Sequence, residues 1–583
     1  MVNIAQFLGY LINNRILKSG LMKKQSYRGL AAIALVGAML TGCKLIGDVE
    51  YTVQQDPVQM HGDSVKVSVT VKFPEKGLKK KASAEITPKL GDASFKTITV
   101  QGEKATGNGQ TIAYKPGGTV NYTDVLPYNS SMENADLMVT GEVKKGKKVV
   151  PLDPEKIADG TIITPYLVMN DDKALIGKDN FVRTTEETYS GTQLNYLKGK
   201  SDVRSTELKD KDIPAFQAWM ADAQVNPKKK VKSINYVAYA SPEGEVAKNG
   251  ELANDRAKSG KAAVEKILTQ AKFTQVITHN EQPKGEDWDG FKSAVNASAL
   301  KDKELIIRVL QMYPDPVKRE EEIKNMGKTY TDLEKEILPS LRRTQINVVY
   351  DKIGWSDDEL KSLSTSKPDT LTIEEILFTA TLYTDLNEKM RLYKLATTRF
   401  PEDWRGWNNV GYVYYMQNDL ANAKTNWEKA NSIKENPVTL NNLGIIARVQ
   451  EKDRAKATKL YTSAVSAGSE VKYNLGIIDI QNGNYAQAIG NFGSNNTFNK
   501  ALAQLLNGDY DAAKTTIDAS PDKDSAMGYY LKAIIGARKN DLTMLTENLT
   551  QAVAKDSSLK AKAAKDREFI KFFENASFKA IVG

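Results

Sequence analysis

The chain has 583 residues, of which 41% are hydrophobic and 26% charged, and its formal net charge is +9. This length predicts three or four domains, and the lysine clusters, which are scattered and lack interleaved aromatic residues, indicate solvated loop tips rather than a nucleic-acid platform. The single cysteine, Cys43, excludes an intrachain disulfide and a thiolate-rich metal site, and the two histidines leave other metal sites and His-assisted nucleophile triads poorly supported.

Residues 22–43 have the pattern of an export signal and read MKKQSYRGLAAIALVGAMLTGC. A basic stretch precedes an apolar core from Leu30 to Leu40, which has secretory length and is too short to span a bilayer. The core ends in Leu-Thr-Gly-Cys, which resembles the lipobox of bacterial lipoproteins. The resemblance implies that Cys43 is lipidated on its thiol and becomes the new N-terminus; a plain signal with a chance cysteine is the alternative.

We therefore expect residues 1–43 to be a lipoprotein signal, with the true start possible at Met22. Lys44 differs from the aspartate that retains some lipoproteins at the inner membrane, and this favours the outer membrane. The residues after Cys43 lack a tight acidic cluster, so a periplasm-facing orientation is favoured while surface exposure stays open.

Residues 44–185 are predicted to be a β-sandwich domain and a linker. From Glu50 to about Tyr166, short runs of two-residue alternation are separated by turn residues. The clearest run, DSVKVSVTVKF, places four valines on one face: Val65, Val67, Val69 and Val71. Several strands at this spacing predict one sandwich of roughly immunoglobulin size, which we interpret as an assembly or spacer module.

Residues 186–352 combine stretches of helical spacing with stretches of strand-like, two-residue alternation. The stretch DIPAFQAWMADAQ has helical spacing, VKSINYVAYA reads as a strand followed by a loop and a long helix, and RRTQINVVY closes the region with alternating apolar residues. This order of mixed helices and strands predicts an α/β sandwich.

The loop and helix after the first of these strands read YASPEGEVAKNGELANDRA, and they resemble the OmpA-type peptidoglycan-associated domain over roughly Gln193–Tyr350. In that family a T-D-x-x-G loop precedes a helix that begins N-x-x-L-S-x-x-R-A. Ser241, Gly244, Asn249 and Arg256 stand at the aspartate, glycine, asparagine and arginine positions, and the paired arginines before the last strand resemble the closing motif. The resemblance implies that these four residues bind diaminopimelate of the peptidoglycan stem peptide.

This sequence departs from the family at the charged position of the loop. Ser241 cannot supply the carboxylate that pairs with the ligand's ammonium, and neutral hydrogen bonds are roughly half as strong as charge-assisted ones. Glu243 or Glu245 could substitute from a different loop position. Wall binding and a turn retained only for structure therefore both stay open.

The helix itself predicts how the site is arranged. Asn249 and Arg256 are two turns apart and share a face, and Asn249 stands where an N-cap is expected. Arg256 can present its fork to a ligand carboxylate or form a structural ion pair with Asp255 or Glu243. The stripe that we expect to pack on the sheet consists of Ala253, Ala257, Gly260, Val264 and Ile267.

About 70 residues between Leu268 and Leu338 form an insert that is longer than the family usually has. Within it, KGEDWDGF places Glu286, Asp287 and Asp289 around Trp288. A paired-carboxylate hydrolase needs acids on opposite sides of its substrate, and acids on one loop do not provide this. We interpret the stretch as a turn pinned by a buried tryptophan.

Residues 353–583 are predicted to be TPR-like helical repeats. Ser356-x-x-Glu359 and Thr372-x-x-Glu375 have the spacing of capping boxes. Small and large residues then recur as in tetratricopeptide (TPR) repeats, most clearly at Trp407, Val410, Gly411, Tyr414, Ala423, Trp427 and Ala430, again at Leu440, Leu443, Gly444, Ala447, Tyr461 and Ala464, and again at Tyr473, Leu475, Gly476, Ala488 and Phe492. Gly and Ala let paired helices approach closely, and the aromatic residues fill the gap to the next pair.

Together these features predict a non-catalytic outer-membrane lipoprotein without cofactors. It would act as a scaffold or tether, with lipid on Cys43, an OmpA-like domain that contacts peptidoglycan, and a TPR array that binds an unknown protein partner. The alternative is an accessory assembly factor of an envelope secretion or surface-fibre system, in which the OmpA-like domain makes protein contacts only. A cell-wall enzyme is the weakest of the three hypotheses.

Overall fold

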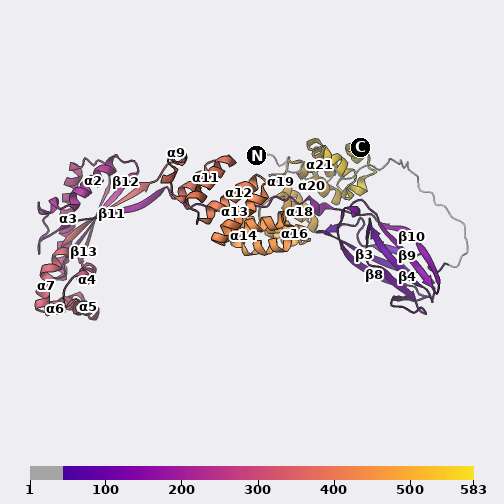
Figure 1. Cartoon of the computed structure of the whole chain (residues 1–583), viewed down its shortest axis with the longest axis horizontal. Coiled ribbons are helices and arrows are strands. Elements are labelled where there is room, and N and C mark those ends of the chain that lie inside the picture. Colours follow the sequence, from indigo (N-terminus) through magenta and orange to yellow (C-terminus); the bar gives the residue numbers. More distant parts are fainter. Residues whose placement is uncertain (1–43) are drawn as a thin grey trace. The chain divides into compact units, whose positions relative to one another are not determined.

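The computed structural model describes residues 44–583 (Figure 1). Cys43 and the signal that it ends lie outside the described residues. The described residues form two compact units, one made of residues 44–167 together with Asp522–Gly583, and the other of Val168–Pro521. These units are not the domains expected from the sequence, so the boundaries at residues 185 and 353 stay predictions.

The first unit contains a β-sandwich with two sheets. One sheet has the order β1-β3-β2, with β8 also paired to β3, and the other has the order β10-β9-β4-β6-β7, with β5 paired to β4. The strands are β1 (Glu50–Val53), β2 (Met60–His61), β3 (Ser64–Phe73), β4 (Ser83–Leu90), β5 (Ala93–Ser94), β6 (Ile98–Gly102), β7 (Gln110–Ile112), β8 (Gly118–Pro127), β9 (Leu137–Lys145) and β10 (Lys148–Ala158). The four valines of β3 are at most 2% exposed, which confirms the predicted alternation.

The last helices of the chain belong to this same unit. They are α20 (Ala526–Arg538), α21 (Leu542–Lys555), α22 (Ser558–Ala563) and α23 (Ala576–Val582). The carboxylate of Glu568, with 1% of its side chain exposed, accepts from Arg538 Nε at 2.8 Å and from the hydroxyl of Thr164, and Arg567 Nε donates to the carbonyl of Gly160 at 2.9 Å. Because a buried carboxylate needs such partners, these helices stay with the sandwich unit.

The second unit contains the α/β domain. Its sheet has the order β11-β14-β12-β13, and only the β12–β13 pair is parallel. Its elements are β11 (Thr184–Asn195), α2 (Asp212–Val225), β12 (Lys229–Ala240), α3 (Val246–Gln270), β13 (Thr278–Glu286) and β14 (Arg343–Ile353). The predicted stripe of α3 is buried, and residues of α2 and α3 share one core with the sheet. The strand β13 was not predicted, because polar residues dominate its sequence.

The insert between α3 and β14 forms a small helical subdomain. Its helices are α4 (Trp288–Ala297), α5 (Lys303–Met312), α6 (Pro316–Lys324), α7 (Lys328–Glu336) and α8 (Leu338–Leu341). They have an apolar core of their own around Phe291, Val295 and Ile306. Trp288 begins α4 and is only half-buried, so the expected turn around a buried tryptophan was wrong.

The remaining helices form the TPR-like array. They are α9 (Asp357–Ser366), α10 (Ile373–Thr381), α11 (Leu386–Arg399), α12 (Trp404–Met416), α13 (Leu420–Ile433), α14 (Pro437–Val449), α15 (Arg454–Ser463), α16 (Ser469–Asn482), α17 (Tyr485–Phe492), α18 (Phe498–Asn507) and α19 (Tyr510–Asp518). Both predicted capping boxes are present.

The repeat glycines explain how each helix pair packs. A Cβ on Gly411 would lie 2.6 Å from Trp427, and one on Gly444 would lie 2.5 Å from Tyr461. Such distances are shorter than any ordinary carbon contact, so the aromatic ring of the second helix fits only against glycine. This confirms that glycine lets paired helices approach closely, and it places the aromatic ring against the glycine of its own pair. Among residues 44–583, no helix has the length and apolar character needed to cross a bilayer.

Candidate functional site

The structure brings the four predicted wall-binding residues to one end of the α/β sheet. Ser241 follows β12 and is 3% exposed, and Asn249 Nδ2 donates to the carbonyl of Ser241 at 3.4 Å. Asn249 is not the N-cap of α3, because that helix begins at Val246. Its amide instead reaches Glu286 Oε1 at 2.9 Å. Gly244 has ordinary space around it, with Asn249 Oδ1 3.5 Å from an added Cβ.

Arg256 is buried, and its fork is used within the fold. Its side chain bonds backbone carbonyls, and the whole residue is 1% exposed. Nε donates to Lys200 at 3.0 Å, Nη1 to Tyr239 at 2.8 Å and Nη2 to Leu197 at 3.3 Å. Burial lowers the pKa of Arg256 to about 10. The guanidinium therefore ties the segment before α2 to the end of β12, an arrangement that neither of the two expected carboxylate pairings anticipated.

A carboxylate of the chain itself fills the niche beside Ser241. Glu243 accepts from Arg342 Nε at 2.8 Å and from Arg342 Nη2 at 3.2 Å, and also from the hydroxyl of Ser241. Lys198 Nζ lies 3.3 Å from the same carboxylate and also pairs with Glu334 on α7. Burial would raise the pKa of Glu243, but the hydrogen bonds from Arg342 and Ser241 outweigh it and hold that pKa below its usual value.

The acids of KGEDWDGF also have structural partners. Glu286 accepts from Asn249 and, at 2.9 Å, from Trp288 Nε1. Asp287 is the N-cap of α4, and its carboxylate pairs with Arg343 Nη2 at 2.6 Å. Asp289 is exposed on the first turn of α4. Within residues 44–583, no cluster of His, Cys, Asp or Glu is arranged to hold a metal ion.

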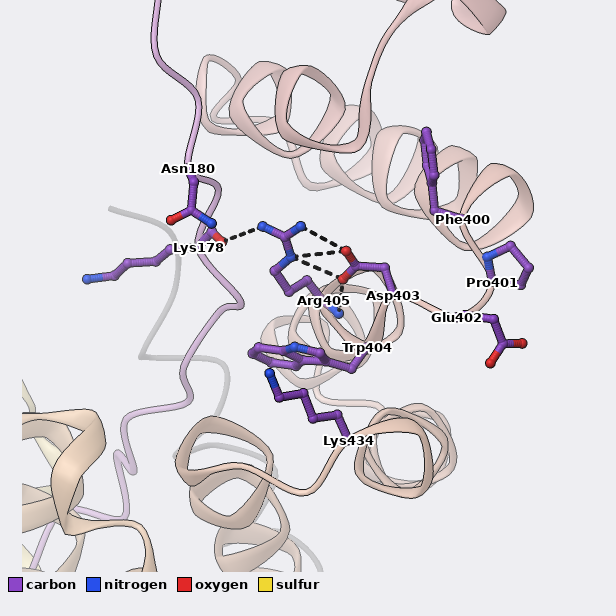
Figure 2. Close-up of a pocket in the computed structure, with 9 residues that line it drawn as sticks. All are labelled: Lys178, Asn180, Phe400, Pro401, Glu402, Asp403, Trp404, Arg405 and Lys434. Carbon is purple, nitrogen blue, oxygen red and sulfur yellow. Dashed lines mark hydrogen bonds and ion pairs between the residues drawn. The ribbon is translucent and has the colours of Figure 1, made fainter. Parts of the chain in front are cut away.

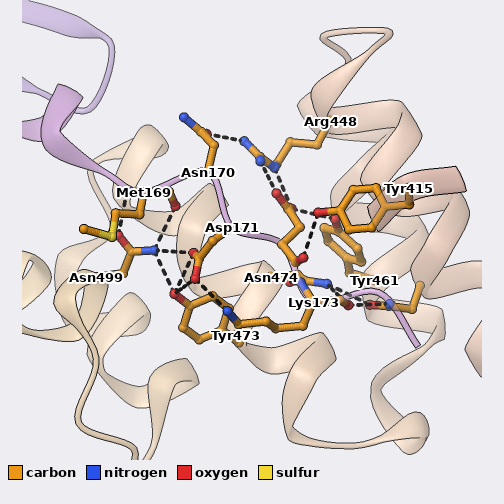
Figure 3. Close-up of polar contacts among 12 residues, drawn as sticks. Met169, Asn170, Asp171, Lys173, Tyr415, Arg448, Tyr461, Tyr473, Asn474 and Asn499 are labelled. Carbon is orange, nitrogen blue, oxygen red and sulfur yellow. Dashed lines mark hydrogen bonds and ion pairs between the residues drawn. The ribbon is translucent and has the colours of Figure 1, made fainter. Parts of the chain in front are cut away.

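A second site, which sequence reasoning missed, lies in the array. Residues 168–182, which we call the connecting segment, were expected to be a plain linker. They run in extended form across helices α12, α14, α16 and α18 (Figures 1 and 3). We call the face of these helices that carries Asn409, Asn442, Asn474 and Asn499 the asparagine face. It explains why the second unit begins at Val168.

Each asparagine of this face bonds both main-chain groups of one residue in the connecting segment. The side-chain oxygen accepts the backbone N–H and the side-chain nitrogen donates to the carbonyl, as a neighbouring strand would do. The distances are 2.8 and 2.9 Å for Asn499 with Met169, 2.7 and 3.1 Å for Asn474 with Lys173, 2.8 and 2.7 Å for Asn442 with Leu175, and 2.6 and 2.9 Å for Asn409 with Gly177.

Two further asparagines join the amides of Asn409, Asn442 and Asn474 into a continuous network. Asn408 Nδ2 donates to the carbonyl of Leu175 at 3.0 Å, and Asn441 Nδ2 donates to that of Lys173 at 2.9 Å. Asn442 Nδ2 also donates to Asn408 Oδ1 at 2.9 Å, and Asn474 Nδ2 to Asn441 Oδ1 at the same distance. All of these side chains are at most 1% exposed, and the network satisfies them as buried polar groups require.

One side chain of the connecting segment enters a charged pocket of the array. The carboxylate of Asp172 is fully buried and is held by Arg448, whose Nε lies 2.7 Å from Oδ1. Tyr461 donates its hydroxyl to the same oxygen at 3.0 Å, and Tyr415 donates to the Asp172 carbonyl at 2.8 Å (Figure 3). Burial and the nearby Asp172 carboxylate raise the pKa of Tyr461 well above its usual value, so this hydroxyl remains a donor.

Neighbouring residues of the connecting segment add polar and apolar contacts. Asp171 accepts from the Tyr473 hydroxyl at 2.7 Å (Figure 3). Ala174 and Leu175 pack among the apolar residues of the helix pairs. Gly177 passes so close to α12 that an added Cβ would lie 2.8 Å from Arg405 Cγ.

The repeat sequence does contain a signal for this site. An asparagine stands two positions before the small residue of each repeat, as Asn409 before Gly411, Asn442 before Gly444, Asn474 before Gly476, and Asn499 before Ala501. Asparagine in the middle of a helix is unfavourable unless its side chain has a partner. Its recurrence on the first helix of successive pairs therefore indicates a common ligand along that face.

An open pocket of about 680 Å³ lies where the connecting segment leaves the asparagine face (Figure 2). Lys178 and Asn180 of the segment line it, together with residues 400–405 and Lys434. Arg405 is already engaged, because it pairs with Asp403 and Glu374 at 2.8 Å and donates to the Lys178 carbonyl at 3.2 Å. The pocket thus adds little binding capacity beyond the exposed Lys and Glu side chains.

Comparison with known proteins adds only a general likeness of fold. No protein-family model matches the chain, and no curated protein sequence matches it. Among solved structures, the type IV pilus biogenesis factor PilW is 14% identical with a TM-score of 0.29, over 36% of this chain and 98% of PilW. A tetratricopeptide repeat protein from Parabacteroides merdae is 13% identical with a TM-score of 0.27, over 39% of this chain and 89% of that one. These scores are too low to support an argument about function.

Proposed function

We propose that this protein is a non-catalytic scaffold of the bacterial cell envelope, held at the outer membrane by lipid on Cys43 and facing the periplasm. The observation that carries the proposal is the asparagine face, on which the helical array holds an extended stretch of the chain's own main chain. Side-chain amides that complete the hydrogen bonds of an extended backbone are a means of holding polypeptide, as in strand addition. The acids of KGEDWDGF, by contrast, are bonded within the fold or exposed on one helix turn.

For the α/β domain, we propose protein contacts as its main role, as in an accessory assembly factor. The guanidinium of Arg342 is already paired with Glu243, and that of Arg256 is bonded to three backbone carbonyls. Neither arginine therefore offers a free fork to a ligand carboxylate. Peptidoglycan binding is the second candidate. What favours it is the convergence of Ser241, Asn249 and Arg256 at one end of the sheet.

Sedimentation with purified sacculi separates these two roles. We expect residues 44–583 to remain in the supernatant. The Ser241→Asp variant restores the charge of the family loop, and it tests whether the missing carboxylate is the cause. Asp255→Asn is the matched control, because Asp255 is exposed on α3, the helix that carries Asn249 and Arg256. Sedimentation of the unaltered protein would establish wall binding instead. Because Arg256 also ties segments of the fold together, loss of sedimentation in Arg256→Ala but not in the control counts only where the circular dichroism of the variant is unaltered.

The anchor and the lack of catalysis need separate tests. A Cys43→Ala variant should leave the outer-membrane fraction, and its persistence there would exclude lipid as the anchor. Release of muropeptides from sacculi by the pure protein would contradict a non-catalytic role. Cross-linking in cells, followed by identification of the captured chains, would name the protein partner of the scaffold.

A further inference from the structure

The contacts of the connecting segment divide into two classes that differ in what they recognise. The asparagines bond the N–H and C=O groups of Met169, Lys173, Leu175 and Gly177, which every residue except proline provides. These contacts require an extended backbone but not a particular sequence. The three residues between Met169 and Lys173 instead offer their side chains to the array.

The side-chain contacts select an acid at one position. Asp172 is 0% exposed at its side chain, and Arg448 opposite it is only 4% exposed. Arg448 Nη1 also donates to Asn170 Oδ1 at 2.8 Å, so the guanidinium is turned fully toward the segment (Figure 3). A neutral residue at this position would leave a buried guanidinium without its counter-charge, and such unpaired buried charges are strongly unfavourable.

We propose that the asparagine face is a binding site for an extended polypeptide with an acidic residue in the pocket of Arg448, Tyr461 and Tyr415, and that residues 169–177 are its intramolecular occupant. The inference rests on the proposed scaffold function and adds the class of polypeptide that the array accepts. In the intact chain the connecting segment closes this site, so a partner protein binds elsewhere unless the segment is released.

Covalent attachment is what keeps the site closed. A segment tethered next to its own site has an effective concentration on the order of millimolar, and this segment is tethered at both ends. A free peptide of the same sequence therefore competes only near that concentration. Without the resident segment, the buried asparagines and Arg448 lose their partners and become available to an added peptide.

The test uses residues 44–583 and a variant in which residues 169–177 are replaced by a Gly-Ser linker of equal length. The probe is a fluorescent synthetic peptide with the sequence of residues 166–180, and its binding is followed by anisotropy. We expect no binding to the unaltered chain and saturable binding to the linker variant. A probe carrying Asp172→Asn should bind at least about tenfold more weakly, since it lacks a charge-assisted hydrogen bond.

Arg448→Met in the linker variant is the matched control, and it should abolish the preference between the two probes. A linker variant with unaltered helical circular dichroism that binds neither probe would overturn the proposal. Equal affinity for the two probes would overturn the part that concerns the acid.

A second measurement covers the case in which the linker variant does not fold. Recognition sequences for a specific protease are placed before Val168 and after Val182, and the chain is cut only after it has folded. The excised segment should elute with the array on gel filtration and exchange with labelled peptide, as mass spectrometry would show. Loss of the segment without rebinding of the probe would contradict the proposal. Neither peptide-binding experiment uses the lipid anchor, peptidoglycan or a partner protein. Failure of the peptide-binding proposal can therefore be told apart from failure of the proposed envelope function.

Discussion

The α/β domain and the array each contain a site that the chain fills from within, and the two are filled by different chemistry. In the α/β domain, a single carboxylate from Glu243 lies among Arg342, Ser241 and Lys198. On the asparagine face, the occupant is a stretch of backbone that neutral amides hold at four residues between Met169 and Gly177. The niche in the α/β domain depends on the Glu243 side chain. The asparagine face depends mainly on main-chain hydrogen bonds, which the sequence of the connecting segment hardly affects.

This difference predicts how each site responds to substitution. A single change at Glu243 removes the whole occupant of its niche and leaves the buried Arg342 guanidinium without its carboxylate. No single change in the connecting segment removes its main-chain bonds. Asp172 is the point at which the two modes meet, because there the backbone occupant also places a charge in a buried pocket. The largest effects should therefore come from the pocket around Asp172.

Arg448→Met should be the most damaging substitution. It leaves the buried Asp172 carboxylate without its cation, which costs on the order of 3–5 kcal/mol when a buried pair is broken. Amide hydrogen exchange of residues 169–177 should accelerate accordingly, as measured by mass spectrometry. Adding Asp172→Asn to this variant should recover part of the protection. If the double variant were as open as the single one, the ion pair would not be what anchors the segment.

Asn442→Ala should have the next largest effect. It removes the acceptor of the half-buried Leu175 N–H and one of the two amides that donate to the Leu175 carbonyl, and it breaks the link to Asn408. Each buried group left unsatisfied costs about 1–3 kcal/mol. Exchange of the Leu175 amide should therefore rise the most within the segment. Asn387→Ala, at an exposed position in the first turn of α11, is the control and should change exchange little.

The sequence allowed the helix pairs to be predicted but not the occupant of the asparagine face. The glycine–aromatic spacing reports contacts within one repeat, so Gly411 and Trp427 could be paired from their positions alone. The connecting segment meets the array across more than 200 residues of chain, as the separation of Gly177 and Asn409 shows. Its own sequence carries no strand pattern, because its backbone partners are side chains rather than a sheet.

The same limit applies to the α/β domain. The loop and helix pattern grouped Ser241, Asn249 and Arg256, and in the structure Asn249 bonds Ser241 while Arg256 bonds Tyr239 near the end of β12. The pattern could not show that Arg256 would bond the carbonyls of Leu197 and Lys200, since these belong to a loop with no recognisable motif. Burial of the guanidinium followed from that loop and not from the helix.

Gly177→Ala should have a moderate effect confined to one end of the connecting segment. The added Cβ would lie 2.8 Å from Arg405 Cγ and 3.0 Å from its Cα, so the backbone must shift. Overpacking of this kind typically costs about 1–3 kcal/mol. Limited trypsin digestion should then cut faster after Lys178. Gly490→Ala is the control, because its Cβ would enter open space on α17. Equal digestion of both variants would show that the close approach at Gly177 is dispensable.

The smallest expected effect concerns acid sensitivity at Glu243, and it tests the other half of the comparison. The pKa of Glu243 in the folded chain lies below its usual value because Arg342 and Ser241 bond the carboxylate. Its contribution to stability is therefore complete above the unfolded pKa of a glutamate, about 4.3, and is lost as the pH falls through the lower folded pKa.

Hydrogen exchange at the end of β12 should accelerate as the pH falls below roughly 4, after correction for the intrinsic rate. Glu243→Gln should flatten this dependence, and because residues 169–177 are held by neutral amides around one ion pair, the same substitution should leave exchange of the connecting segment unchanged. A parallel acid response in both sites, with Glu243→Gln abolishing neither, would mean that the niche is held by something other than its carboxylate.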